Sequence, residues 1–200
     1  MAFRLGDVYS VSMPTDANSV NMERRYHHGD LRAALIAAGL DLLAQRDGAA
    51  PGLRELARAA GVSATAVYRH FPDHNALLAA LAAAGLDKLA EAQRAAAEAA
   101  GGGKAAFAAT GRAYVRFALD NPSLFRLIFT SRHAAGDMGQ GSAFAMLRAN
   151  AEATAPPGEG AAYALGAWSI VHGLATLLLD GQVDADDAMI ARVIEGAVPR

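Results

Sequence analysis

Side chains able to form hydrogen bonds with a nucleic acid are concentrated in one short segment of this chain. They are Thr65, Tyr68, Arg69 and His70, and the apolar Ala64 before them adds little bulk in front of the polar groups. Arginine can pair with the edge of guanine, and threonine can bond a base or touch a thymine methyl group. Tyrosine, histidine and free backbone amides suit phosphate oxygens, and a small residue lets the backbone approach the bases. These residue types therefore favour contact with duplex DNA.

The surrounding sequence predicts the two short helices that must position this segment. Residues 53–60 carry apolar side chains at helical spacing, and Gly61 stands where a sharply ending helix needs a residue tolerant of positive φ. Ser63 can cap a second helix over residues 64–71, because its hydroxyl oxygen can accept from a free amide of the first turn. Pro72 then ends this second helix, since proline cannot continue the helical hydrogen bonds.

The second helix has a predicted inward face formed by Val67 and Phe71, which are four positions apart. Two helices joined by a short glycine-containing turn make a helix-turn-helix, whose second helix can lie in the major groove of DNA. An ordinary helical hairpin with a solvated polar face is the alternative interpretation of the same spacing.

The segment ELARAAGVSATAVYRHFPDHNALL resembles the DNA-binding signature of the tetracycline-repressor (TetR) family of bacterial transcriptional regulators. The resemblance extends over about residues 26–81 and implies an all-α fold. It also implies a set of DNA contacts at Arg54, Ser63, Ala64, Thr65, Tyr68, Arg69, His70 and His74.

Two positions depart from the family pattern. Pro51-Gly52 replaces the usual Ser or Thr cap, although glycine is a tolerable cap and proline favours a helix start. His74 replaces the usual phosphate-binding lysine, so we expect a weaker and pH-sensitive anchor there.

Composition and periodicity predict an all-α chain in three parts. Apolar residues make up 53% of the 200 residues, alanine dominates, and no strand-like alternation is present. We expect a disordered tail over residues 1–22, with Met22 as a candidate natural start. A three-helix helix-turn-helix bundle follows over residues 23–80 and continues into a helical ligand-binding and dimerisation domain over residues 81–200. The boundary falls inside one long helix at residues 75–100, which Asp73 is expected to cap.

The predicted helices outside the motif cover residues 30–46, 104–119, 123–130, 142–153, 161–179 and 183–198, the last with Asp184 as its cap. The first carries an apolar stripe formed by Leu31, Leu35, Ala38 and Leu42, which Ile36 and Leu43 widen. The helix over residues 161–179 is apolar on nearly all sides, so its own domain or a partner must bury it. We therefore expect a homodimer through helices near residues 161–179 and 184–198.

Aromatic residues of the C-terminal part can form either a plain core or the lining of a ligand cavity. They are Phe107, Tyr114, Phe117, Phe125, Phe129 and Trp168, together with His172. The family resemblance favours a cavity for a small apolar effector. Trp168, His172 and Gly173 resemble a Trp-x3-His-Gly element of one TetR-like subgroup. For His172 itself, a hydrogen bond within the core is the favoured role over a ligand contact.

The sequence contains no cysteine, no uninterrupted apolar run of 18 residues and no signal peptide, so we expect a cytoplasmic protein without a membrane partner. His70 and His74 are separated by Pro72 and do not predict a zinc pair. Catalytic carboxylate pairs, nucleophile triads and phosphate-binding glycine loops are not recognisable, so we predict no enzyme, no metal and no cofactor.

The function predicted from the sequence is that of a ligand-responsive repressor that binds a palindromic operator in double-stranded DNA as a dimer. Its two recognition helices would lie about one helical turn apart, ~34 Å. The alternatives are an all-α enzyme or ligand-binding protein, and an adaptor that binds protein through residues 64–71.

Overall fold

The computed structural model of the chain describes residues 31–45, 49–130, 145, 147–149, 151, 152, 155, 157–184 and 186–197. The predicted tail and half of the helix predicted at residues 142–153 lie outside these residues. The described part of the chain is all-α and contains no strand, as the sequence predicts. Its helices are α1 (Leu31–Ala44), α2 (Leu53–Ala59), α3 (Ala64–His70), α4 (His74–Ala99), α5 (Gly103–Asp120), α6 (Pro122–Thr130), α8 (Gly160–Leu179) and α9 (Asp187–Ala197).

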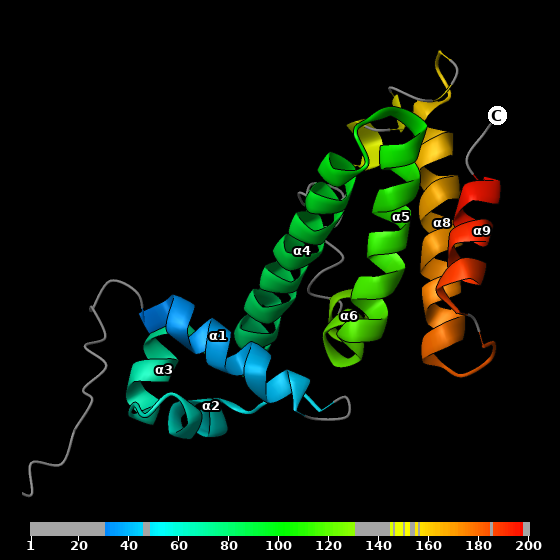
Figure 1. Cartoon of the computed structure of the whole chain (residues 1–200). Helices are drawn as coiled ribbons and strands as arrows, with labels where there is room; N and C mark the ends of the chain where they lie inside the picture. The colour runs from blue at the N-terminus through cyan, green and yellow to red at the C-terminus, as the bar shows by residue number, and fades with distance from the viewer. Residues whose placement is uncertain are drawn as a thin grey trace, which may run out of the picture.

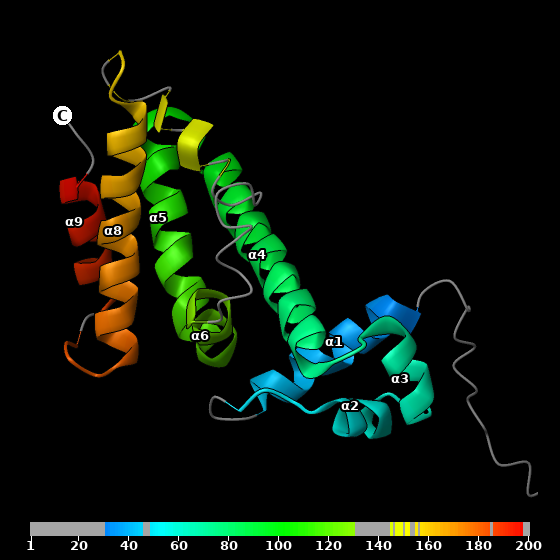
Figure 2. The ribbon, with the colours of Figure 1, turned by 180° about the vertical axis from the view of Figure 1, so that it is seen from behind.

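Helices α1, α2 and α3 form a small bundle together with the first turns of α4 (Figures 1 and 2). Its core consists of side chains that are almost completely buried, namely Leu35, Leu56, Val67, Phe71, Leu77 and Leu81. Burial of each such side chain stabilises the fold by about 1.5–3 kcal/mol relative to leaving it in water. The two short helices therefore depend on this core, because helices of this length are not stable alone.

Helix α4 leaves the bundle and runs beside α5, with α8 and α9 on the far side of α5 (Figure 1). It has 26 residues, begins at the Asp73 cap, and ends before three glycines with positive φ. The Asp73 Oδ1 atom accepts from the Ala76 amide at 2.8 Å, so the predicted cap is confirmed. One continuous helix thus joins the two predicted domains.

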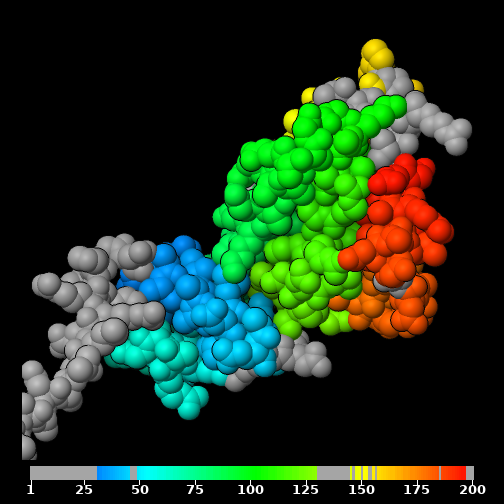
Figure 3. Space-filling model, viewed as in Figure 1, coloured from blue at the N-terminus to red at the C-terminus, as the bar shows by residue number. Residues whose placement is uncertain are grey.

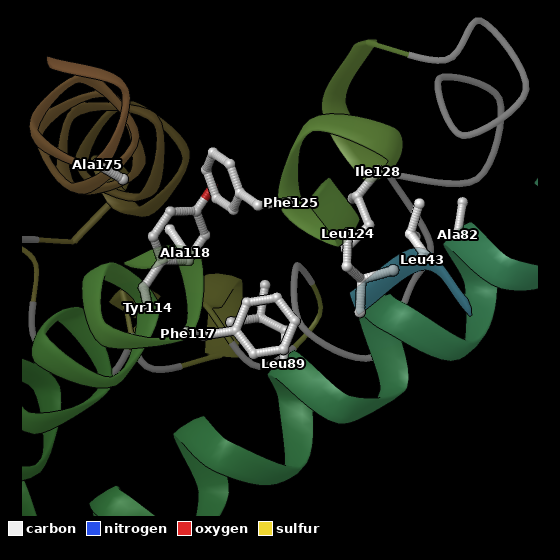
Figure 4. Close-up of a cluster of buried hydrophobic side chains, with 10 residues drawn as sticks. All are labelled: Leu43, Ala82, Leu89, Tyr114, Phe117, Ala118, Leu124, Phe125, Ile128 and Ala175. Atoms are coloured by element: carbon white, nitrogen blue, oxygen red, sulfur yellow. The ribbon is translucent and has the colours of Figure 1, made fainter. Parts of the chain in front are cut away.

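A second core lies between α4, α5, α6 and α8 (Figure 4). In it Phe117 points toward Leu89 of α4, whereas Tyr114 points toward Phe125 of α6. Helix α6 also touches α1, since Leu43 belongs to this core. The N-terminal bundle and the C-terminal part of the chain are therefore in direct contact through α6 as well as joined by α4.

Glycine allows the close crossing of α4 and α6. A Cβ atom at Gly85 would lie 2.8 Å from both the Leu124 Cδ1 and the Ile128 Cδ1 atoms. Both of those side chains are buried, so they have little room to move. The absence of a side chain at Gly85 is thus required for the observed helix spacing.

Several predicted helix ends differ from the observed ones. Helix α3 ends at His70 and α4 begins at His74, one residue earlier than predicted in each case. The predicted cap at Asp184 is wrong, because the Asp186 Oδ1 atom accepts from the Met189 amide at 2.8 Å. Both aspartates lie shortly before the helix, so residue type alone does not tell which of them is the cap.

Helix α8 is apolar but only partly covered in this single chain, where Ala164 and Ala175 are its buried residues. By length and average hydropathy it could cross a membrane, and it is the one such helix among the described residues. It contains no uninterrupted apolar run of 18 residues, because Ser169, His172 and Thr176 interrupt the run. One such helix is weak support for a membrane span, since helices in the cores of soluble proteins have the same composition.

Candidate functional site

The turn between α2 and α3 has the geometry that the sequence predicts. Gly61 has a φ of +68°, which only glycine adopts without strain, and the Val62 amide donates to the Ala57 carbonyl at 3.0 Å. The Ser63 Oγ atom accepts from the Ala66 amide at 3.2 Å and caps α3 as predicted. These local bonds fix the direction of α3 relative to α2.

Helix α3 has one buried side and one open side. Val67 and Phe71 are 0% and 1% exposed and belong to the bundle core. The Arg32 guanidinium of α1 lies over the Phe71 ring at 5.5 Å from its centroid, a cation–π contact that holds the end of α3 against α1. Tyr68 is 45% exposed although it is aromatic, and Thr65, Arg69 and His70 are exposed beside it.

All eight residues predicted to contact DNA are exposed in the chain: Arg54, Ser63, Ala64, Thr65, Tyr68, Arg69, His70 and His74. They come from the first turn of α2, the turn, α3 and the first turn of α4. The fold therefore brings them to the same end of the molecule, the small bundle. Their contacts with DNA stay a prediction.

His74 has a partner that the sequence did not indicate. Its Nε2 atom lies 3.2 Å from the Pro51 carbonyl oxygen, just before α2. Because a carbonyl oxygen only accepts, Nε2 must carry a proton. The side chain expected to bind phosphate is thus already engaged with the protein. A bond between residues 23 positions apart leaves no periodic signal in a sequence.

A buried polar network joins α5 and α8 in the C-terminal domain. The Trp168 Nε1–H donates to the Tyr114 Oη atom at 3.2 Å, and this hydroxyl lies 2.8 Å from His172 Nδ1. Since tryptophan can only donate, the tyrosine hydrogen is left for His172, which then carries its own proton on Nε2. Burial raises the pKa of the Tyr114 hydroxyl and lowers the pKa of His172, so both groups are neutral at pH 7.

Two phenylalanines of α6 complete this cluster. The Phe125 and Phe129 rings lie 4.7 Å apart, and their centroids are 5.5 Å and 4.8 Å from the His172 ring. These distances are those of packed aromatic pairs. Five of the seven predicted ligand-binding residues thus form one group: Tyr114, Phe125, Phe129, Trp168 and His172. A ligand contact by any of them stays a prediction.

The other two predicted ligand-binding residues lie elsewhere. Phe117 faces α4 in the second core (Figure 4). Phe107 stacks on Tyr163 at 5.4 Å. Tyr163 was not predicted as a site residue, and its buried hydroxyl has no hydrogen-bond partner among the described residues. An isolated tyrosine at the start of an apolar helix carries no sequence signal that would have singled it out.

Two hollows are lined entirely by described residues, and neither contains the predicted ligand-binding residues. One of about 560 Å³ lies between α4, α5 and the start of α9, with Arg112 and Arg116 at its edge. Another of about 350 Å³ lies where α1 meets the junction of α5 and α6, beside Asp41 and Asp120. Within the described ranges, no three acidic or histidine side chains are grouped as metal ligands.

Comparisons with known proteins agree with this geometry. Residues 35–81 match the family described as bacterial regulatory proteins, tetR family, and residues 107–198 match the tetracyclin repressor-like, C-terminal domain. No curated protein matches the chain significantly.

Solved structures cover nearly the whole fold. A protein with unknown function from Rhodococcus sp. RHA1 is 34% identical over 88% of this chain and 95% of its own, with a TM-score of 0.70. A tetR-family transcriptional regulator from Streptomyces coelicolor is 23% identical over 83% of this chain and 80% of its own, with a TM-score of 0.64. The regulator LfrR from Mycobacterium smegmatis, solved in complex with proflavine, is 24% identical over 84% of this chain and 94% of its own, with a TM-score of 0.54.

Proposed function

Because the chain belongs to the tetR family of bacterial regulatory proteins and is a DNA-binding transcriptional regulator, we propose that it is a ligand-responsive repressor whose α3 reads an operator. The observation that carries this proposal is the contrast between the two sides of α3. Val67 and Phe71 are buried in the bundle core, whereas Tyr68 and Arg69 are exposed to solvent on the opposite side of α3. A helix fixed by its apolar side and polar on its open side suits insertion into a major groove.

Each exposed residue of this surface has a chemically distinct role in the proposal. Arg69 pairs with the O6 and N7 atoms of a guanine, and Thr65 contacts a neighbouring base. Tyr68, His70 and Arg54 contact phosphates, which position the helix without reading the sequence. The Ser63 hydroxyl oxygen is used by the cap, so only its hydrogen is left to donate to a phosphate.

The proposal further assigns the exposed apolar faces of α8 and α9 to a second copy of the chain. Leu165 is 58% exposed and Leu177 45%, while Met189 and Val193 on α9 are 41% and 38% exposed. Helix α9 lies at the outer edge of the molecule in Figure 3. Large apolar side chains gathered on two adjacent helices mark an interface rather than a solvated surface. A four-helix contact with the same faces of a partner would cover them, including the face of α8 that resembles a membrane span.

An effector-dependent step completes the proposed function. The cluster around Tyr114 and His172 is the proposed site for a small apolar effector, in line with the resemblance of Trp168, His172 and Gly173 to a TetR-like subgroup. Helix α6 contributes Phe125 and Phe129 to this cluster and also touches α1 and α4. An effector that shifts α6 would therefore shift the DNA-binding bundle, and release of DNA follows by linkage. No catalytic step is needed, and the function belongs in the cytoplasm, where bacterial DNA lies.

The test is selection of duplexes by the purified protein from a random-sequence library, followed by binding measurements on the enriched sequence. We expect a palindromic site, and Arg69→Ala should weaken binding roughly 10- to 100-fold and relax specificity at one base pair of each half-site. Arg94→Ala is the matched control, because Arg94 is also exposed but lies in the far half of α4. If no duplex is enriched, or if both variants bind equally, α3 does not read DNA.

A further inference from the structure

A side-chain hydrogen bond closes the helix-turn-helix unit, at a residue where the family pattern usually has lysine. We propose that His74 is a positioning residue, which holds α2 and α4 together in the DNA-binding geometry and does not act as a phosphate contact. This inference rests on the proposed function, because positioning matters only if the unit binds DNA.

The geometry places the two ends of the unit against each other. His74 is the first residue of α4, and Pro51 directly precedes Gly52, the N-cap of α2. The His74 Nε2 atom reaches the Pro51 carbonyl oxygen at 3.2 Å, across 23 positions of chain that contain α2, the turn and α3. The segment that reads DNA in the proposed function is therefore a loop whose ends are joined by this bond as well as by the bundle core.

Pro51 is a well-fixed partner for such a bond. Its side chain is almost completely buried, and its ring restricts φ. The helical bonds of α2 begin at the next residue, where the Leu56 amide donates to the Gly52 carbonyl at 2.9 Å. The Pro51 carbonyl thus lies outside that ladder, and His74 supplies it with a donor. Because both atoms are held by structured elements, the bond fixes the start of α2 relative to the start of α4.

The chemistry of the ring separates positioning from phosphate binding. With Nε2–H donated to Pro51, the second nitrogen of a neutral ring, Nδ1, can only accept. Phosphate oxygens also only accept, so the neutral ring cannot hold Pro51 and bind a phosphate at the same time. A lysine at this position would carry three donors and a permanent charge, and it could serve both partners.

The consequence for function concerns α4, which runs from this bond into the C-terminal domain. A displacement of α4 reaches α3 along the chain through Phe71 and Pro72, and through the His74 bond it also reaches α2. Arg54 in the first turn of α2 then moves together with α3. Without the bond, the two sides of the unit could separate slightly and the DNA-contacting residues would lose their common spacing.

The experiment uses the full-length protein and the duplex that the wild type selects. For His74→Ala we expect a roughly three- to tenfold loss of affinity, the size of one net hydrogen bond, with an unchanged salt dependence. His74→Gln, whose side-chain amide can donate to the same carbonyl, should restore affinity to within about twofold. Amide exchange of the free protein should be faster at Leu56 in His74→Ala than in the wild type, and normal again in His74→Gln.

Contrary results are equally defined. If His74 contacts phosphate, His74→Ala lowers the slope of the logarithm of affinity against the logarithm of salt concentration by about 0.9. This result overturns the inference, as does wild-type affinity of His74→Ala, or failure of His74→Gln to restore binding. A wild-type protein that selects no duplex refutes the proposed function instead, while exchange at Leu56 still decides whether the bond positions α2.

Discussion

Tyr114 is the residue on which the polar network of the C-terminal domain depends. Its hydroxyl accepts from Trp168 and donates to His172, and it is 4% exposed. Tyr114→Phe removes this hydroxyl and with it both of these part-buried hydrogen bonds. We expect a loss of about 1–3 kcal/mol in the free energy of unfolding, measured by chemical denaturation.

Tyr163→Phe is the matched control for that prediction. The Tyr163 hydroxyl has no hydrogen-bond partner among the described residues, and burial raises its pKa. Its removal should leave stability unchanged or slightly higher, because no bond is lost. Equal losses in the two variants would show that the network contributes nothing beyond ring packing.

His172 makes stability depend on pH in a defined direction. Burial lowers its pKa below the ordinary value of 6.5, so the unfolded chain takes up a proton at a higher pH than the folded chain does. Stability is therefore fully present above pH 6.5 and falls as the pH drops through the window between the two pKa values. We expect the melting temperature to fall more between pH 7.5 and pH 5 in the wild type than in His172→Asn, whose amide oxygen can still accept from Tyr114. Parallel curves would contradict this assignment.

Hydrogen bonds between residues close in sequence could be predicted, whereas those between distant residues could not. The caps at Ser63 and Asp73 were predictable because their hydrogen bonds join residues three positions apart. The partners of His74 and His172 were not, since these bonds span 23 and 58 positions. Local sequence rules predict helix ends and turns, whereas long-range polar contacts depend on how the helices finally cross.

At the scale of helices, the crossing of α4 and α6 is set by Gly85. Helix propensity alone should raise the free energy of unfolding of Gly85→Ala by about 1 kcal/mol. The added methyl group, however, would lie 2.8 Å from two buried side chains. Overpacking costs about 1–3 kcal/mol, so we expect net destabilisation and weaker DNA binding, because α6 would be pushed away from α4 and α1. Denaturation and binding to the selected duplex measure the two effects.

Gly196→Ala serves as the control for this crossing. A Cβ atom at Gly196 meets nothing within 4 Å in this chain, so it should gain stability from propensity alone. If Gly85→Ala is as stable as Gly196→Ala, the close approach of α4 and α6 is not a constraint.

Helix positions were largely predictable from the sequence, but their buried faces were not. Apolar periodicity identified α1, yet its buried residues are Leu35, Gly39 and Leu43 rather than the full predicted stripe. This helix is packed by α2 and α4 on one side and by α6 on another, so a single stripe is a poor description. For α8 the sequence required burial on most sides, and within one chain that burial does not occur.

At the scale of the whole molecule, the exposed faces of α8 and α9 predict the oligomeric state. Leu165→Glu combined with Val193→Glu should convert a dimer into a monomer, because the proposed interface would bury two charges per chain. We expect half the mass by light scattering and greatly weakened operator binding, since one α3 alone reads only one half-site.

Ala95→Glu is the control for added charge, because Ala95 is exposed on α4. This variant should keep the mass and the affinity of the wild type. If the wild-type protein is already monomeric at micromolar concentration, the proposed interface is wrong. It would also leave the exposed apolar residues of α8 without an explanation.

Leu40 of α1 and Leu127 of α6 each pack against the core of the small bundle and against the second core. These shared contacts couple the two cores, so heating should produce one cooperative transition despite two functional regions. The same pair limits modular exchange between relatives. In a chimera that takes its first 80 residues from another regulator, Leu127 would pack against different side chains. We expect such a chimera to be stable only if the residues that contact Leu127 are kept.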